Sequence, residues 1–305
     1  MQQKLLWVFL FCFFDAAIGQ QTQTVVQNQI GFAVFDFFEG DPKDNVPIIY
    51  FHGTSSSKIE PYILLEQIKE KKRTVIAFDR PGYGDTRYVE FDSLDDYVLW
   101  FKQQLLPNLE SVLGFQPVHY DLVSVSGGAL FSLRAACAVP ERVRKVSVLS
   151  AGLFGRPVGG EGRYEKTRRF VARRPLATKI IMRAGNRNLD ILKSISAQRL
   201  SEPDKVFADS HAELGKQVYI DATKCGVAGI VQDARLQLYD TSYAMPLPKQ
   251  VMVEIWNGDR DNTISLESAR LLSKGTGVAL NVIRNEGHIS SLPIAFKKSV
   301  RSAKD

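Results

Sequence analysis

The chain has 305 residues, of which 45% are hydrophobic and 24% are charged, and its formal net charge is +6. This is the composition of an ordinary globular protein with one large core or two modest ones. The sequence has no internal repeat or low-complexity tract, and no apolar run approaches the roughly 20 residues that a membrane-spanning helix needs. Repeat, disordered and multispan membrane classes are therefore excluded.

The N-terminus has the three-part pattern of a secretory signal peptide. Lys4 precedes an apolar run at residues 5–14, and the small residues Ala17 and Gly19 follow at the spacing of a cleavage site. We expect residues 1–19 to be the signal peptide and the mature protein to be secreted or periplasmic. An uncleaved anchor and a buried N-terminal helix are the alternatives.

Short apolar runs then alternate with helical patterns. Segments with the pattern of buried or half-buried strands occur at residues 30–38, 46–51, 74–78, 118–125 and 143–151. Helical spacing separates several of them, at residues 59–71, 94–113 and 128–139, and Pro107 should interrupt or kink the second of these helices. Because each crossover is long enough for a parallel connection, the sequence predicts an α/β fold with a mostly parallel sheet covered on both faces.

This alternation stops at Gly152 and resumes near residue 250. The region between has no clear buried strand, and from Leu153 to Leu200 it carries twelve Lys or Arg against three Asp or Glu. Strand patterns return at residues 250–256 and 278–283, with helical patterns at 265–274 and after 289. We interpret residues 153–245 as an inserted helical cap or lid, and residues 20–152 and 246–305 as the core domain.

Ser126 follows a predicted strand within the stretch SVSGG at residues 124–128. In an open parallel sheet, chemistry gathers at the carboxyl ends of the strands. The spacing is that of a nucleophile elbow, which needs small residues two before and two after the nucleophile. The N–H of Gly127, at the start of a helix, would form half of an oxyanion hole. The alternative is that the small residues only let a helix pack closely on a sheet.

The second oxyanion donor is expected in the His-Gly-Thr turn at residues 52–54, which ends another strand. The N–H of Thr54 is the first choice and that of Ser55 the second. His52 itself is expected to hold this loop rather than to react.

Position selects the base among four histidines. His119 begins a strand, His211 lies in the cap and His52 belongs to the turn, whereas His288 follows the last strand. Imidazole has the pKa that proton transfer near neutrality requires. The partner acid should follow the penultimate strand, where we choose Asp261 and assign the neighbouring Asp259 to the turn. The chain order of these residues is then serine, acid, histidine.

Together these segments resemble the α/β-hydrolase fold superfamily, from about Val46 to Leu292. The resemblance rests on YFHGT at 50–54, DRPGYGDT at 79–86, LVSVSGGA at 122–129, NGDRD at 257–261 and EGH at 286–288. It implies an α/β-hydrolase fold with an inserted helical cap. It also implies that Ser126 is the nucleophile, His288 the base and Asp261 the orienting acid, with the N–H groups of Thr54 and Gly127 as the oxyanion hole.

Two positions depart from the usual pattern of this superfamily. Ser124 replaces the first glycine of the elbow, and Ser55-Ser56 replace a Pro-Gly pair after the His-Gly turn. Both departures concern the shape of the oxyanion loop rather than the class of protein.

The resemblance implies a serine hydrolase that cleaves a carboxylic ester, or a related acyl bond, of a small or medium apolar substrate. Serine at the elbow argues against epoxide hydrolases and haloalkane dehalogenases, which would have aspartate there. The alternatives are a thioesterase, an aminopeptidase-like hydrolase and a non-catalytic ligand-binding protein. An aminopeptidase would need carboxylates in the cap to hold a free amine, and the candidates are Glu161, Glu165, Glu202, Asp204, Asp209 and Glu213.

We expect no cofactor, metal or nucleic-acid partner. No Cys/His cluster has metal-ligand spacing, and neither G-x-G-x-x-G nor Gly-Lys-Ser/Thr occurs. Cys137 and Cys225 are expected to be free buried thiols rather than a disulfide. The basic stretch at residues 168–187 is interspersed with apolar residues. It predicts either a solvated outer face of the cap or a weak contact with an anionic surface or acidic substrate.

Overall fold

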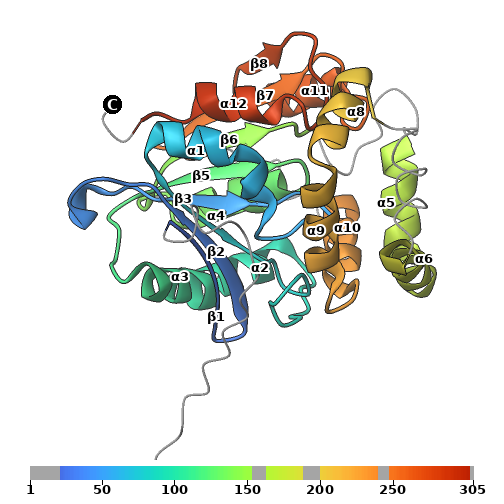
Figure 1. Ribbon diagram of the computed structural model, residues 1–305, viewed down its shortest axis with the longest axis horizontal. Helices are drawn as coiled ribbons and strands as arrows, with labels where there is room; N and C mark the ends of the chain where they lie inside the picture. Colours follow the sequence, from blue (N-terminus) through green and yellow to red (C-terminus); the bar gives the residue numbers. More distant parts are fainter. Residues whose placement is uncertain (1–20, 153–162, 188–199, 240–246, 303–305) are drawn as a thin grey trace, which may run out of the picture.

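The strands assemble into one eight-stranded sheet in a computed structural model, which describes residues 21–152, 163–187, 200–239 and 247–302 (Figure 1). The strand order is β1-β2-β4-β3-β5-β6-β7-β8. Every pair from β4 to β8 in this order is parallel, and only β1 and β2 add antiparallel pairs at one edge. The predicted mostly parallel sheet is therefore confirmed. The strands are β1 (Thr22–Gln27), β2 (Ile30–Asp36), β3 (Ile48–Phe51), β4 (Thr74–Phe78), β5 (Tyr120–Val125), β6 (Val143–Leu149), β7 (Met252–Gly258) and β8 (Leu280–Ile283).

Strand β1 is absent from the sequence prediction. It forms a hairpin with β2 through Asn28 and Gln29, whose φ angles of 47° and 65° are those of a tight two-residue turn. Its sequence TQTVVQ has few apolar residues, and none of its side chains is fully buried. The strand therefore carries almost no periodic hydrophobic pattern from which it could be predicted.

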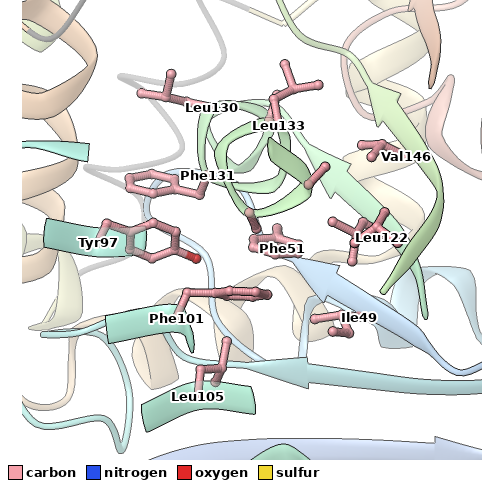
Figure 2. Close-up of a cluster of buried hydrophobic side chains, with 14 of the residues drawn as sticks. Ile49, Phe51, Tyr97, Phe101, Leu105, Leu122, Leu130, Phe131, Leu133 and Val146 are labelled. Carbon is pink, nitrogen blue, oxygen red and sulfur yellow. The ribbon is translucent and has the colours of Figure 1, made fainter. Parts of the chain in front are cut away.

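Helices cover both faces of the sheet (Figure 1). Helices α1 (Leu65–Lys71) and α12 (Leu292–Ser299) pack on one face. The other face carries α2 (Leu94–Trp100), α3 (Leu106–Leu113), α4 (Gly128–Ala138) and α11 (Leu266–Thr276). Successive strand residues point to opposite faces, so Phe51 and Leu122 face α4 while Tyr50 and Val123 face α1 and α12. Figure 2 shows the layer in which Phe51 and Leu122 lie against the α4 side.

The long helix predicted at residues 94–113 is interrupted, as Pro107 indicated. A π turn at Phe101–Leu105 separates α2 from α3. Proline has no N–H to donate to the carbonyl four residues earlier. The turn before Pro107 is accordingly wider, and the Leu106 N–H bonds to the Phe101 carbonyl five residues back.

The described part of residues 153–245 contains helices and no strand. These are α5 (Arg163–Arg173), α6 (Pro175–Arg187), α8 (Glu202–Ser210), α9 (Ala212–Thr223) and α10 (Ala228–Tyr239). Helix α5 packs on α10 and α6 packs on α5, so that α5 and α6 form the edge of the molecule beyond α10 (Figure 1). The predicted cap boundaries at residues 153 and 245 lie outside the described residues. No helix in the described ranges is long and apolar enough to cross a membrane.

The two cysteines of the described chain are free, but their predicted burial is wrong for Cys225. Cys137 is half-buried in α4, whereas Cys225 is exposed. Cys225 lies in the turn between α9 and α10, beside Gly226 with its φ of 111°. A tight turn on the surface leaves no apolar layer to cover the thiol.

A buried lysine joins the core to the cap. The side chain of Lys58 is 2% exposed. Its Nζ lies 2.9 Å from Asp79, 2.8 Å from Asp85 and 2.9 Å from Asp221. Asp79 and Asp85 belong to the loop after β4, whereas Asp221 belongs to α9. Burial alone would lower the pKa of Lys58, but the charges of Asp79 and Asp221 raise it, so the side chain remains an ammonium.

We predict that Lys58→Met destabilises the protein by about 3 to 5 kcal/mol, because it leaves carboxylates without their buried counter-ion. Urea unfolding would measure the loss. The control Lys69→Met removes a lysine whose exposed partner is Glu66, and it should cost less than about 1 kcal/mol. Equal effects of the two substitutions would contradict a special role of the buried cluster.

Candidate active site

Ser126 follows β5 in a left-handed backbone conformation, with φ at 49°. This region is strained for a residue with a side chain, and such strain persists only where the surroundings enforce it. The enforcement comes from Gly128, where a Cβ would clash with the Phe51 carbonyl oxygen and lie 2.6 Å from that of His52. Helix α4 therefore begins in direct contact with the end of β3. This is the tight turn between strand and helix that the small residues at 124–128 predict.

Ser124, the departure from glycine in this turn, is fully buried. The Ser132 hydroxyl of α4 donates a hydrogen bond to its Oγ at 2.8 Å. A hydroxyl at this position is therefore hydrogen-bonded to the helix that packs over it, as a buried polar group must be.

Thr54 and Gly127 lie against each other beside Ser126. A Cβ on Gly127 would overlap Thr54 Oγ1. Among the described residues, the backbone N–H groups of Thr54 and Gly127 have no hydrogen-bond acceptor. Both are available to a ligand.

Gln237 covers this pair from α10, and the sequence analysis missed it. Its Nε2 lies 3.3 Å from Thr54 Oγ1 and 3.4 Å from the Gly127 carbonyl oxygen, and the side chain is fully buried. Its only signal in the sequence is its place near the end of the cap, since only the tertiary structure brings α10 to this loop.

The His-Gly-Thr turn is held by Arg80. The Nε2 of His52 accepts the Arg80 N–H at 3.3 Å, and its Nδ1–H donates to the Gly53 carbonyl at 2.8 Å. Burial, together with the charge of Arg80, lowers the pKa of His52 well below its usual range. The Arg80 guanidinium also bonds to the carbonyl oxygens of His52 and Gly53 and forms a 2.6 Å ion pair with Asp233 of α10. His52 is therefore a neutral part of the loop.

His288 and Asp261 are in direct contact. The His288 Nδ1 lies 2.8 Å from Asp261 Oδ2, while Asp261 Oδ1 accepts the N–H groups of Thr263 and Ile264, both at 2.8 Å. Because a carboxylate only accepts, Nδ1 carries a hydrogen, and in the neutral ring Nε2 keeps its lone pair. The neighbouring Asp259 instead accepts the backbone N–H of Asn285, in the loop after β8, at 2.7 Å.

Asp204 of α8 binds the loop that carries His288. Its Oδ2 accepts the His288 N–H at 2.9 Å, and its Oδ1 accepts those of Ile289 and Ser290 at 2.8 and 3.0 Å. The Ser201 hydroxyl donates to Oδ2 at 2.8 Å. Burial would raise the pKa of Asp204, but these hydrogen bonds lower it, so the carboxylate is charged. The sequence analysis considered Asp204 only as an amine ligand, because this contact joins residues 84 positions apart.

Electrostatics favour the charged form of His288. Burial would lower its pKa, but the contact with Asp261, and then the charges of Asp204 and Glu60, raise it above the ordinary 6.5. His288 is buried, with 8% of the residue exposed.

Glu60 also belongs to this group of residues, although the sequence analysis did not identify it. Its Oε2 accepts the Gly53 N–H at 3.0 Å. A Cβ added to Gly53 would lie 3.3 Å from Glu60 Oε1 and 3.8 Å from Ser126 Cβ. Burial raises the pKa of Glu60. A carboxyl group thus lies close to the elbow.

The structure brings His288 and Asp261 together, and separately Thr54 and Gly127, around the elbow. Among the described residues, no hydrogen bond joins the Ser126 hydroxyl to the His288 ring. Such bonds are often long until a substrate binds. The arrangement holds a hydroxyl, free N–H donors and an oriented imidazole after the carboxyl ends of β3, β5 and β8 in one sheet.

The fold is that of an α/β hydrolase. The model of the alpha/beta hydrolase family matches residues 48–295, so the chain belongs to that family. Among solved structures, a thermophilic esterase from Thermogutta terrifontis superimposes with a TM-score of 0.61 at 18% identity, covering 92% of this chain and 95% of the esterase. The enol-lactonase from Burkholderia xenovorans gives 0.61 at 12% identity, covering 90% and 97%. At these identities the likeness concerns the fold alone.

A proline iminopeptidase from Lactobacillus delbrueckii subsp. lactis is 28% identical over 117 residues. The match covers 37% of this chain and 38% of the iminopeptidase. The chain thus matches well under half of that relative's length.

We predict that Asp204→Asn lowers the pKa of His288, because it removes a negative charge that raises it. NMR titration of the ring would measure the change, which a merely structural role of Asp204 would not produce. Stability should also fall by about 2 to 3 kcal/mol, since an amide nitrogen would face backbone donors. The control Glu202→Gln removes an exposed acid from the same helix and should leave both unchanged. An unaltered His288 titration in Asp204→Asn would disprove the coupling.

Proposed function

We propose that the protein is a serine hydrolase that cleaves a carboxylic ester, or a related acyl bond, of a small or medium apolar substrate. The observation that carries this proposal is the strained backbone of Ser126 beside the free N–H groups of Gly127 and Thr54. A hydroxyl on such a turn can attack a carbonyl carbon while two N–H donors bind the developing oxyanion.

In this mechanism His288 Nε2 takes the proton of the Ser126 hydroxyl as its oxygen attacks the ester carbonyl. Asp261 fixes the ring through Nδ1 and stabilises the imidazolium. His288 then gives the proton to the leaving alcohol, which yields an acyl-enzyme. Water attacks the acyl-enzyme by the same route, with His288 again as base, and releases the acid.

A second candidate is an aminopeptidase-like hydrolase, and Glu60 is the observation that favours it. A carboxylate near Ser126 could hold the free amine of a substrate. The cap carboxylates are poorer candidates: Asp204 is fully engaged, Asp209 is exposed, and Glu202 and Glu213 lie beside lysines. The side chains of Glu161 and Glu165 lie outside the described residues.

Hydrolysis of an amino-acid p-nitroanilide compared with a p-nitrophenyl ester separates the two candidates. If Glu60 holds an amine, Glu60→Gln abolishes anilide cleavage and spares ester cleavage. If the protein cleaves no anilide, the aminopeptidase-like candidate is excluded and the ester hydrolase is retained.

We also retain export as a proposal. Its support is the pattern of Lys4, the apolar run and the small residues that follow. Residues 1–20 lie outside the described residues.

We predict that a fluorophosphonate probe labels the wild-type protein and that Ser126→Ala abolishes labelling, since the probe reacts with activated serine hydroxyls. The control Ser210→Ala removes an exposed hydroxyl at the end of α8 and should retain full labelling. Labelling of Ser126→Ala would identify another nucleophile. A folded wild-type protein that is not labelled would favour a non-catalytic binding role.

We predict an acid limb in kcat/KM for ester hydrolysis, with a midpoint above 6.5 because the pKa of His288 is raised. The base must be neutral, so activity is full above this pKa and is lost as the pH falls through it. In Glu60→Gln, which removes one of the charges that raise the pKa of His288, the limb should persist but move to lower pH. A flat profile between about pH 5 and 8 would contradict His288 as base.

A further inference from the structure

The outward face of α6 combines exposed apolar and cationic side chains. Leu176 is 71% exposed and Ile180, one turn later, is 61% exposed. Lys179 and Arg183 are also exposed. They lie one turn apart from each other, on the same side of the helix as Leu176 and Ile180. Thr178, on the opposite side of the helix, is buried. The apolar residues are therefore on the solvent side rather than in the cap core.

The charge of this region has one sign. Residues 166–187 include eight Lys or Arg and no Asp or Glu. Among the described residues, Arg174, Lys179 and Arg183 have no carboxylate partner. A solvated helix face normally mixes charges of both signs, often in pairs one turn apart. In α8, for example, Lys205 pairs with Glu202.

A hollow of about 340 Å³ adjoins this face. Lys179, Met182 and Arg183 of α6 line one side, and residues 223–227 at the junction of α9 and α10 line the other. Lys224 adds a third cation, although it also contacts Asp85 and Asp221. The hollow has the charge and the room for an anionic head group.

We propose that the outward face of α6 docks on the surface of an anionic phospholipid bilayer. Leu176 and Ile180 would enter the interface, and Lys179 and Arg183 would contact lipid phosphates, as in helices that lie in the plane of a membrane surface. A nucleic acid would match the cations but not the aliphatic side chains, since bases stack on aromatic rings.

The place of α6 in the fold agrees with this docking mode. Helices α5 and α6 form the edge of the molecule beyond α10 (Figure 1). Helix α10 in turn carries Gln237 to the site around Ser126. A bilayer on α6 would therefore lie on the cap side of the protein. The inference goes beyond the proposed ester chemistry and does not depend on it.

Co-sedimentation with vesicles tests the proposal on the full protein. We expect binding to phosphatidylcholine vesicles that contain phosphatidylglycerol, little binding to phosphatidylcholine alone, and weaker binding as salt screens the charges. The double variant Lys179→Glu and Arg183→Glu should lower the partition coefficient at least about tenfold. The double variant Leu176→Ser and Ile180→Ser should lower it by several-fold at high salt, where the apolar contribution dominates.

Two matched controls lie outside the cap. Val118→Ser removes an apolar side chain that is 70% exposed before β5, and Lys102→Glu reverses an exposed lysine of the π turn. Both should bind vesicles like the wild type. Fluorophosphonate labelling in solution, or circular dichroism if labelling fails in all proteins, would establish that each variant is folded.

Several results would overturn the proposal. These are equal binding to neutral and anionic vesicles, equal losses in the control variants, and no vesicle binding at all. Displacement by inorganic phosphate, but not by chloride at equal ionic strength, would instead indicate a site for a soluble anion. Loss of vesicle binding with labelling intact separates failure of this surface from failure of the proposed hydrolase.

Discussion

The close approach of two backbone segments at the ends of β3 and β5 is the constraint on which the rest of the site depends. No side chain fits at Gly128, because the carbonyl groups of Phe51 and His52 occupy its place. This contact accompanies the left-handed conformation of Ser126 and sets Gly127 beside Thr54. The strain costs stability locally, and it is tolerated because the parallel sheet and α4 over-determine the turn.

Buried charges connect this core to the cap, and the described cap helices divide into two groups. Helices α8, α9 and α10 each send one aspartate to the core: Asp204 to the His288 loop, Asp221 to Lys58 and Asp233 to Arg80. Each of these buried charges needs its partner, since a buried charge without one destabilises the fold. Helices α5 and α6 lie outside this acidic layer and are basic. The inner side of the cap thus contacts the His288 loop, Lys58 and Arg80, while its outer side carries mainly positive charge.

The parts of the fold that the sequence predicted are those whose pattern is local. Strands such as β3 and β5 are continuous apolar runs, and the elbow needs small residues at fixed spacing whatever surrounds it. The missed strand β1 has little apolar pattern and exists because β2 offers it an edge. The predicted burial of Cys225 rested on its residue type alone. It is wrong, because the residue lies in a turn at the surface.

The sequence by itself determined the class of fold and the candidate residues Ser126, Asp261 and His288, because chain order and strand ends restrict where such groups can stand. The tertiary structure places His288 against the Asp261 that the sequence analysis chose, and only the tertiary structure decided that Asp204, Glu60 and Gln237 surround the site. These contacts join segments far apart in the chain, through side chains whose types are common everywhere on protein surfaces. Their meaning comes from burial and hydrogen-bond geometry, which have no local signature in a sequence.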